Sequence, residues 1–229
     1  MSLPAHRQQG RAVRLEWGLG AVELAAEVDV AVVVDVLSFT TTLSIAVERG
    51  TAVEPTAWRG PAEAGSGPRL LSPAAMLRRE PTDHLVLPSP NGAATCAALA
   101  GLTTVVGACL RNAAAVAAWL APQLDAGATV LLVPAGERWP DGSLRPAAED
   151  LWGAGAVLAH LRGHDLSAEA RLAVATHDAV EDDLLDALRD CASGRELVDQ
   201  GYAEDVDVAA GIDASAVVPV LEAGVFTAS

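Results

Sequence analysis

The stretch "VVVDVLSFTTTLSIAVERG", residues 32–50, joins a run of valines to an aspartate, a threonine cluster and a helical pattern. Residues 30–36 are apolar except for Asp35, which predicts a strand buried on both faces. Residues 40–50 predict a helix that ends at Gly50, because glycine suits the left-handed position after a helix. A buried strand that leads directly into a helix is the repeating unit of a parallel α/β sheet.

The same order of strand and helix recurs along the chain. Further strands are predicted at residues 51–56, 84–89, 103–109 and 128–136, and further helices at residues 91–101, 112–122 and 146–161. This alternation, with short connections, predicts a layered α/β/α fold with a largely parallel or mixed central sheet.

The remaining segments are less regular. Residues 61–81 are rich in Pro, Gly and Ser and predict a loop with a helical turn near Met76. Residues 167–199 are mostly helical in pattern, and residues 205–221 predict two strand-like pieces. Since we find no long linker, repeat or low-complexity tract, we expect one domain over residues 1–229.

Charge and composition exclude several kinds of chemistry. The formal net charge is −15, which disfavours nucleic acid and anionic membrane as partners. All 15 basic residues are arginine, so a Schiff-base lysine and a lysine-containing phosphate loop are excluded. No apolar run approaches the roughly 18 residues of a membrane helix, and the N-terminus lacks a secretory pattern, so we expect a cytoplasmic protein. The composition is compatible with a homodimer.

Polar residues gather where predicted strands pass into helices. Ligands of open α/β sheets bind beyond the carboxyl ends of the strands, which is where these residues belong. Four such junctions carry them: Asp35 with Ser38, Thr40, Thr41 and Thr42; Ser89, Asn91 and Gly92; Asn112; and Glu149 with Asp150.

These residue types suit phosphate and a hard metal ion. Helix N-termini offer free N–H groups to an oxyanion, and clustered carboxylates suit Mg²⁺. The alternative is structural: the threonines and asparagines cap helices, and Glu149 and Asp150 complement a helix dipole. Asp35 fits the structural alternative less well, since a carboxylate that ends a buried strand needs partners or a metal.

Three other motifs do not support a site. Cys191 and the arginine after it have the wrong spacing for a cysteine phosphatase loop. The glycines that begin at Gly153 lie within a helical pattern and follow no strand, so they are not a dinucleotide loop. His160 and His164 are four residues apart, but Gly163 lies between them and no glutamate follows His160, so they do not form a zinc motif.

The junctions together resemble the 2-phosphosulfolactate phosphatase family, a Mg²⁺-dependent group whose named reaction belongs to coenzyme M biosynthesis. The similar segments, in order, are "DVLSFTTTLSIAVERGT", "SPNGAAT", "GACLRNAAAVA", "PAGERWPDGSLRPAAEDLWGAGAVLAHL", "SGRELVDQGYAEDVDVAAGID" and "VVPVL". Their order and spacing span most of the chain.

The resemblance implies Mg²⁺-dependent hydrolysis of a small phosphate monoester. It implies catalytic roles for Asn91 and for Asp35, Glu149 and Asp150, the last three as Mg²⁺ ligands. The residues expected to contact phosphate are Thr40, Thr41, Thr42, Gly92, Asn112, Arg111 and Arg195. A phospho-aspartyl intermediate on Asp35 stays open, but no second aspartate follows two residues later, which favours direct attack by water.

This chain departs from the family pattern at some positions. Ser38 stands where the family usually has an arginine, and the segment before Ser72 is short, with Arg69 as a candidate replacement charge. The segment around Asn91 also has fewer threonines. A second hypothesis is therefore a degenerate member that binds an anion or a partner without turnover.

Overall fold

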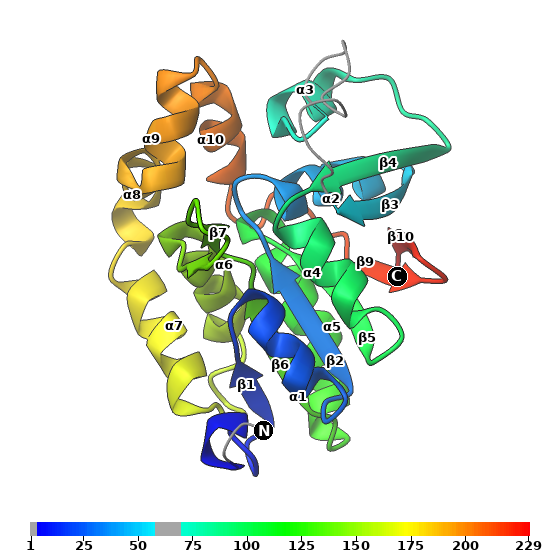
Figure 1. The fold of residues 1–229 in the computed structure, drawn as a ribbon, viewed down its shortest axis with the longest axis vertical. Coiled ribbons are helices and arrows are strands. Elements are labelled where there is room, and N and C mark those ends of the chain that lie inside the picture. Colours follow the sequence, from blue (N-terminus) through cyan, green and yellow to red (C-terminus); the bar gives the residue numbers. More distant parts are fainter. Residues whose placement is uncertain (1–3, 58–69) are drawn as a thin grey trace.

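The computed structural model describes residues 4–57 and 70–229. Their main feature is an eight-stranded mixed sheet with helices on both faces (Figure 1), which confirms the predicted layered α/β fold. In spatial order the strands are β1 (Val13–Leu15), β6 (Val130–Pro134), β2 (Val30–Val34), β5 (Thr104–Ala108), β9 (Pro219–Glu222), β10 (Val225–Ala228), β3 (Ala52–Ala57) and β4 (His84–Ser89). A separate two-stranded hairpin consists of β7 (Glu137–Arg138) and β8 (Leu144–Arg145).

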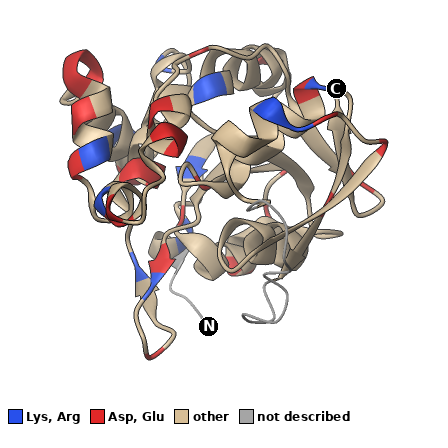
Figure 2. Ribbon diagram, turned by 90° about the horizontal axis from the view of Figure 1, so that it is seen from above, with Lys and Arg blue, Asp and Glu red and all other residues tan. Residues whose placement is uncertain are grey.

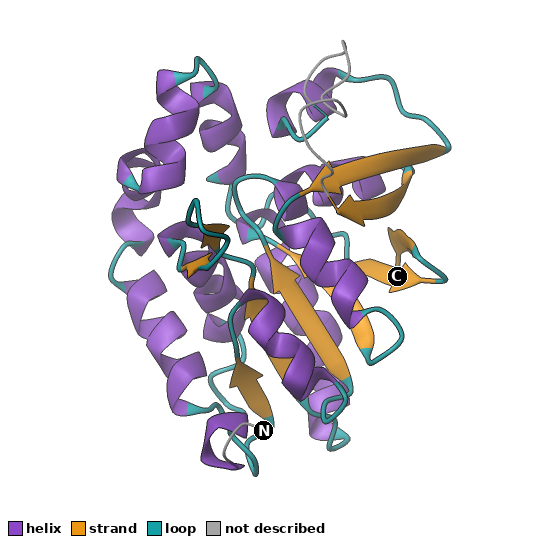
Figure 3. Ribbon diagram, viewed as in Figure 1, coloured by secondary structure: helices purple, strands orange, loops and turns teal. Residues whose placement is uncertain are grey.

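The described residues also form α-helices, which are purple in Figure 3. They are α1 (Val22–Ala25), α2 (Phe39–Glu48), α3 (Pro73–Arg78), α4 (Gly92–Leu99), α5 (Ala113–Asp125), α6 (Ala148–Ala159), α7 (Ala168–Asp178), α8 (Leu184–Asp190), α9 (Ala192–Asp199) and α10 (Ala203–Ala209). Short 3-10 turns are η1 (Pro4–Arg7), η2 (Gly18–Ala21), η4 (Leu110–Asn112) and η5 (Glu181–Asp183). Within the described ranges, no helix combines the length and the apolar character needed to cross a bilayer.

Strand β2 lies at the centre of two hydrophobic cores. Its residues alternate between the two faces of the sheet, as the pleat requires. Val30, Val32 and Val34 pack in the core that α5, α6 and α7 cover, whereas Ala31 and Val33 pack in the core under α1, α2 and α4. All five side chains are buried, which explains why this segment is a continuous apolar run.

The sheet contains strands of both directions. β1, β6, β2 and β5 are parallel, and Val30 of β2 lies opposite Val130 and Thr104. β9 is antiparallel to β5, β10 to β9, and β3 to β10, so β3 and β4 run opposite to β2. Figure 1 shows β3 and β4 turned strongly away from the direction of β2. This twist brings the segment after β4 to the carboxyl end of β2.

Several predicted elements agree with the structure. The helix expected at residues 40–50 is α2, and Gly50 adopts the predicted left-handed conformation with φ +82°. Met76 lies in α3, as the helical turn predicted there requires. The strands β1, β7, β8 and β10 were not predicted, because each has only two to four residues and no alternation to mark it.

One prediction at the C-terminal end is wrong. Residues 205–221 do not form two strand-like pieces, since α10 covers Ala203–Ala209 and only β9 follows. The alternation of aspartate and valine in this segment fits a strand, but the burial is helical: Asp205, Val206 and Ala209 are buried on one side, and Asp207 is exposed. Tertiary packing of that side has overridden the local pattern.

Candidate active site

Asp35 follows β2 directly and joins two strand–helix junctions. It is 6% exposed. Its Oδ1 accepts a hydrogen bond from the N–H of Phe39 at 3.2 Å, in the first turn of α2. Its Oδ2 accepts one from the N–H of Gly92 at 2.8 Å, at the start of α4. The carboxylate is therefore held in one orientation by backbone groups from two helix N-termini.

The threonine cluster stabilises the turn that positions Asp35. Thr40 Oγ1 donates to the carbonyl of Asp35 at 2.7 Å and accepts from its N–H at 2.9 Å. Thr41 Oγ1 donates to the carbonyl of Val36 at 2.8 Å, and Thr42 Oγ1 donates to the carbonyl of residue 71 at 3.0 Å. All three hydroxyl protons go to backbone carbonyls within the fold, which is a structural use but not the helix capping that the structural alternative expects. Contact of these residues with phosphate stays a prediction.

The second junction places a polar group and a glycine next to Asp35. Ser89 Oγ lies 3.4 Å from Asp35 Oδ2, and Asn91 Nδ2 donates to Glu137 Oε2 at 2.9 Å. At Gly92, an added Cβ would lie 2.5 Å from Phe39 Cδ1 and 2.6 Å from Asp35 Oδ2. Only glycine fits there, because any other residue would collide with the carboxylate that its own N–H holds.

Asp150, in the first turn of α6, joins the loops after β2 and β6. Its Oδ1 accepts from the N–H of Val36 at 2.8 Å, the residue after Asp35, and its Oδ2 accepts from the N–H of Gly136 at 2.9 Å. Asp150 and its neighbour Glu149 are both 3% exposed. The predicted meeting of the first and fourth junctions at one edge of the sheet is thus present in the structure.

Glu137 is a fourth member of this carboxylate cluster, and the sequence analysis missed it. It begins the β7–β8 hairpin, soon after β6 ends, and its carboxylate accepts the hydrogen bond from Asn91. Its position after a buried strand resembles that of Asp35, and this was the signal that could have identified it. The surrounding polar residues suggested an ordinary loop instead.

Four carboxylates repel one another here: Asp35, Glu149 and Asp150 are buried, and Glu137 is half-buried. Burial and then the charges of Glu137 and Glu149 raise the pKa of Asp35 to about 6, against the lowering effect of its backbone hydrogen bonds. Burial, Asp35 and Glu149 raise the pKa of Asp150 well above its ordinary value. Burial also raises the pKa of Glu137, with Glu149 contributing and the bond from Asn91 opposing.

No arginine or histidine of the described chain forms an ion pair with these four side chains. Figure 2 shows the basic segments scattered among the helices and loops rather than gathered at one point. The donor types suit Mg²⁺, because that ion prefers carboxylate oxygens and its charge would offset the repulsion that raises these pKa values. No three of these four described side chains bring oxygens within 4.8 Å of one another, so an ion held here would need some of its ligands through water. The backbone bonds to Asp35 and Asp150 leave other lone pairs of their oxygens for an ion.

Cys191 lies at the border of the cluster. It precedes α9, and its thiol accepts the N–H of Gly194 at 3.4 Å. Burial and then the charge of Glu149 raise the pKa of this thiol to about 12. The thiol therefore stays neutral at physiological pH, which agrees with the exclusion of a cysteine phosphatase loop.

Other predicted phosphate-binding residues have partners elsewhere. The side chain of Asn112 accepts from the N–H of Cys109 at 2.8 Å and donates to the carbonyls of Gly107 and Val217 at 3.3 and 3.0 Å, so it fixes the turn after β5. Arg195 is exposed and pairs with Asp190. For both residues, contact with phosphate stays a prediction.

The remaining positive charges are also separate from the carboxylates. Arg111 is buried, and its guanidinium lies 3.8 Å from Glu48 at the far end of α2, with no partner for Nε among the described residues. Ser38 is half-buried at the start of α2, and its side chain caps no N–H there. Ser72 caps α3 and donates to Asp205 at 2.6 Å. Arg69 lies outside the described residues.

A comparison with known families matches most of the chain to one family. The family model described as 2-phosphosulpholactate phosphatase matches residues 71–224, about two-thirds of the chain. The chain belongs to this family. The match covers Asn91, Glu137, Glu149 and Asp150, whereas Asp35 and the threonine cluster lie before it. A search of curated proteins finds no match.

Proposed function

We propose that this protein hydrolyses a small phosphate monoester with the help of Mg²⁺, as the name of the 2-phosphosulpholactate phosphatase family suggests. One observation carries the proposal: four carboxylates from two strand–helix junctions, β2–α2 and β6–α6, meet in a largely buried cluster that has no cationic partner in the described chain. Such a cluster is costly to fold unless a cation joins it. Together with a phosphatase family, a divalent ion is the partner that these donors suit best.

The ligands proposed for Mg²⁺ are Asp35, Glu137, Glu149 and Asp150. When bound, the ion supplies positive charge for the phosphoryl oxygens and lowers the pKa of a coordinated water. The chain's own contribution is positioning. Two backbone N–H groups fix Asp35, and two others fix Asp150, so neither carboxylate has to reorganise when substrate arrives.

Asn91 is proposed as the donor to the phosphoryl group. One N–H of its amide is used by Glu137, and the other has no partner in the described chain. Because Asn91 precedes α4, its amide lies at the positive end of a helix dipole, where an oxyanion is stabilised. This assigns Asn91 both to positioning Glu137 and to contact with substrate.

Direct attack by water fits Asp35 better than a phospho-aspartyl intermediate. Both of its oxygens accept backbone hydrogen bonds, which hold the carboxylate in place and reduce the electron density available for attack. The proposed substrate is a small 2-phosphohydroxy acid, of which 2-phosphosulpholactate is the example that the family name gives. Its acid group requires a cation, and Arg111, Arg195 and Arg69 stay candidates.

A second candidate is binding of an anion or partner without turnover. The observation that favours it is Ser38, which is half-buried and lies three residues after Asp35, while no arginine of the described chain forms an ion pair with the four clustered carboxylates. A phosphate that approaches four carboxylates without a neighbouring guanidinium lacks a contact that accelerates many phosphoryl transfers.

Phosphate release from a panel of 2-phosphohydroxy acids separates the two candidates. We expect release from at least one substrate in Mg²⁺, none in chelator, and none from Asp35→Asn, which keeps the shape of the side chain but not its charge. The matched control is Asp141→Asn, because Asp141 is exposed in the β7–β8 hairpin. Mg²⁺-dependent binding of these acids without release would favour the second candidate, and neither binding nor release would contradict both.

A further inference from the structure

The end of α7 and the start of η5 hold a second group of potential metal ligands, on a different part of the fold from the carboxylate cluster. His177, Asp178 and Glu181 each offer one ligand atom, and these atoms lie within 4.8 Å of one another. His177 and Asp178 end α7, and Glu181 begins η5, so the three ligands come from five consecutive residues. The group shares no residue with the proposed Mg²⁺ site and does not depend on that proposal.

His177 is the unusual member of this group. It is 95% buried, and neither ring nitrogen has a hydrogen-bond partner among the described residues. Its backbone packs tightly against α6, where an added Cβ at Gly155 would lie 2.7 Å from His177 Cβ. A buried imidazole without partners is disfavoured, since buried polar groups are normally hydrogen-bonded. Nδ1 lies 3.7 Å from Asp178 Oδ1, so the ring is directed towards the carboxylates.

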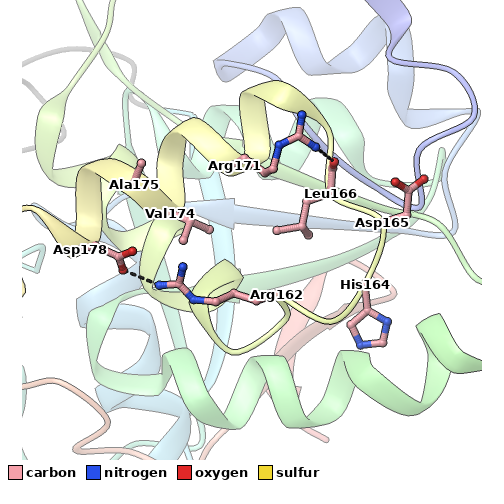
Figure 4. A pocket seen from close by; sticks show the side chains of 8 residues that line it. All are labelled: Arg162, His164, Asp165, Leu166, Arg171, Val174, Ala175 and Asp178. Atoms are coloured by element: carbon pink, nitrogen blue, oxygen red, sulfur yellow. Dashed lines mark hydrogen bonds and ion pairs between the residues drawn. The ribbon is translucent and has the colours of Figure 1, made fainter.

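The surroundings of the group favour a cation. The free carbonyls at the C-terminal end of α7 give this end a partial negative charge. Asp178 and Glu181 are exposed, which leaves an entry path from solvent. One local charge opposes binding: Arg162 donates to Asp178 Oδ1 at 2.5 Å, as Figure 4 shows. The other oxygen of Asp178 has no partner in the described chain.

The donor types indicate which metal fits. One imidazole with two carboxylates is a set that suits Zn²⁺ and related transition-metal ions, whereas Mg²⁺ prefers oxygen alone. Three protein ligands leave a fourth position of a tetrahedral ion to water. We propose that His177, Asp178 and Glu181 bind a Zn²⁺-type ion, at a site that joins the end of α7 to the start of η5.

Titration calorimetry with Zn²⁺ tests the site, with excess Mg²⁺ present to occupy the carboxylate cluster. We expect the wild type to bind one equivalent that is lost or weakened about tenfold or more in Glu181→Gln and in His177→Gln. Asp182→Asn is the matched control, because Asp182 is exposed next to Glu181 but lies outside the group; its affinity should equal that of the wild type.

Three outcomes would overturn the proposal. The first is that the wild type binds no Zn²⁺. The second is that Zn²⁺ affinity falls equally in Glu181→Gln and Asp182→Asn. The third is that Zn²⁺ affinity falls in Glu181→Gln but not in His177→Gln. The last would mean that Zn²⁺ binds only an acidic surface. If His177→Gln does not fold, NMR signals of the His177 ring in the wild type replace it: they should shift on addition of Zn²⁺, and unshifted signals contradict the site.

Discussion

Asp35 shows how a single residue serves both the fold and the proposed chemistry. Its carboxylate accepts backbone N–H groups from α2 and α4, and it lies beside the other three carboxylates of the cluster. The hydrogen bonds favour the charged form, but burial and the neighbouring charges dominate, so its pKa rises to about 6. The pKa of Asp35 therefore links this residue to the stability of the fold and to the proposed binding of Mg²⁺.

The stability of the metal-free protein should depend on the protonation of Asp35. The pKa of Asp35 is higher in the folded chain than in the unfolded chain, so the folded state binds this proton more tightly. The stability that this group contributes is therefore present at low pH and is lost as pH rises through about 6. Relative to Asp35→Asn, we expect the free energy of unfolding of the wild type to fall by up to about 3 kcal/mol between about pH 4 and 7. Urea unfolding in chelator measures it, and a flat or rising difference would refute the assignment.

Gly92 is required by the close approach of α4 to Asp35. We expect Gly92→Ala to lower the free energy of unfolding by about 1–3 kcal/mol, because the new methyl group would collide with Phe39 and with the Asp35 carboxylate. The control is Gly163→Ala, since no atom lies within 4 Å of a Cβ there. Urea unfolding of both variants makes the comparison, and equal effects would show that α4 can move away.

Ser38 tests whether the site lacks a positive charge. We expect Ser38→Arg to raise the rate of phosphate release by about tenfold or more, because a guanidinium beside the phosphoryl group stabilises its developing charge. Ser38→Gln is the uncharged control and should not raise the rate. The site would need no such charge if the wild type turns over substrate, Ser38→Arg does not raise that rate and Arg111→Ala does not lower it.

At the scale of elements, the turn between β2 and α2 depends on side-chain hydroxyls. Thr40 Oγ1 both donates to and accepts from the backbone of Asp35. We expect Thr40→Val to cost about 1–3 kcal/mol in the free energy of unfolding, since it leaves the buried N–H of Asp35 without a partner. Thr104→Val, at an exposed strand position, should cost much less. If thermal unfolding shows the same small change in both, the hydroxyl is not needed for this turn.

The sequence alone could predict elements whose pattern is long and whose burial is simple. The buried run before Asp35 and the helix after it are of this kind, and so is the meeting of Asp35 with Asp150 at parallel strand ends. Glu137 was missed because its hairpin is short and because Asn91, the hydrogen-bond donor to its carboxylate, comes from a distant segment. The hydrogen-bond partners of Asn112 could not be predicted either, since one of them, the carbonyl of Val217, comes from a distant segment.

At the scale of the whole molecule, the sheet brings distant segments to one place. β2 is buried between two cores, and the twist that turns β3 and β4 away carries the start of α4 to Asp35 (Figure 1). α6 then brings Asp150 to the same edge. The packing of both faces stabilises a cluster of carboxylates that would not form in a small or loosely packed chain.

The central claim is that this cluster binds Mg²⁺, and calorimetric titration of the metal-free protein with Mg²⁺ tests it most directly. The account predicts binding near neutral pH that weakens by about tenfold or more per pH unit once the pH is well below 6, where Asp35 and the other carboxylates of raised pKa take up protons. It also predicts about tenfold or greater weakening in Glu137→Gln and none in Asp141→Asn. Absence of Mg²⁺ binding, or equal affinity in Glu137→Gln and the wild type, would contradict it.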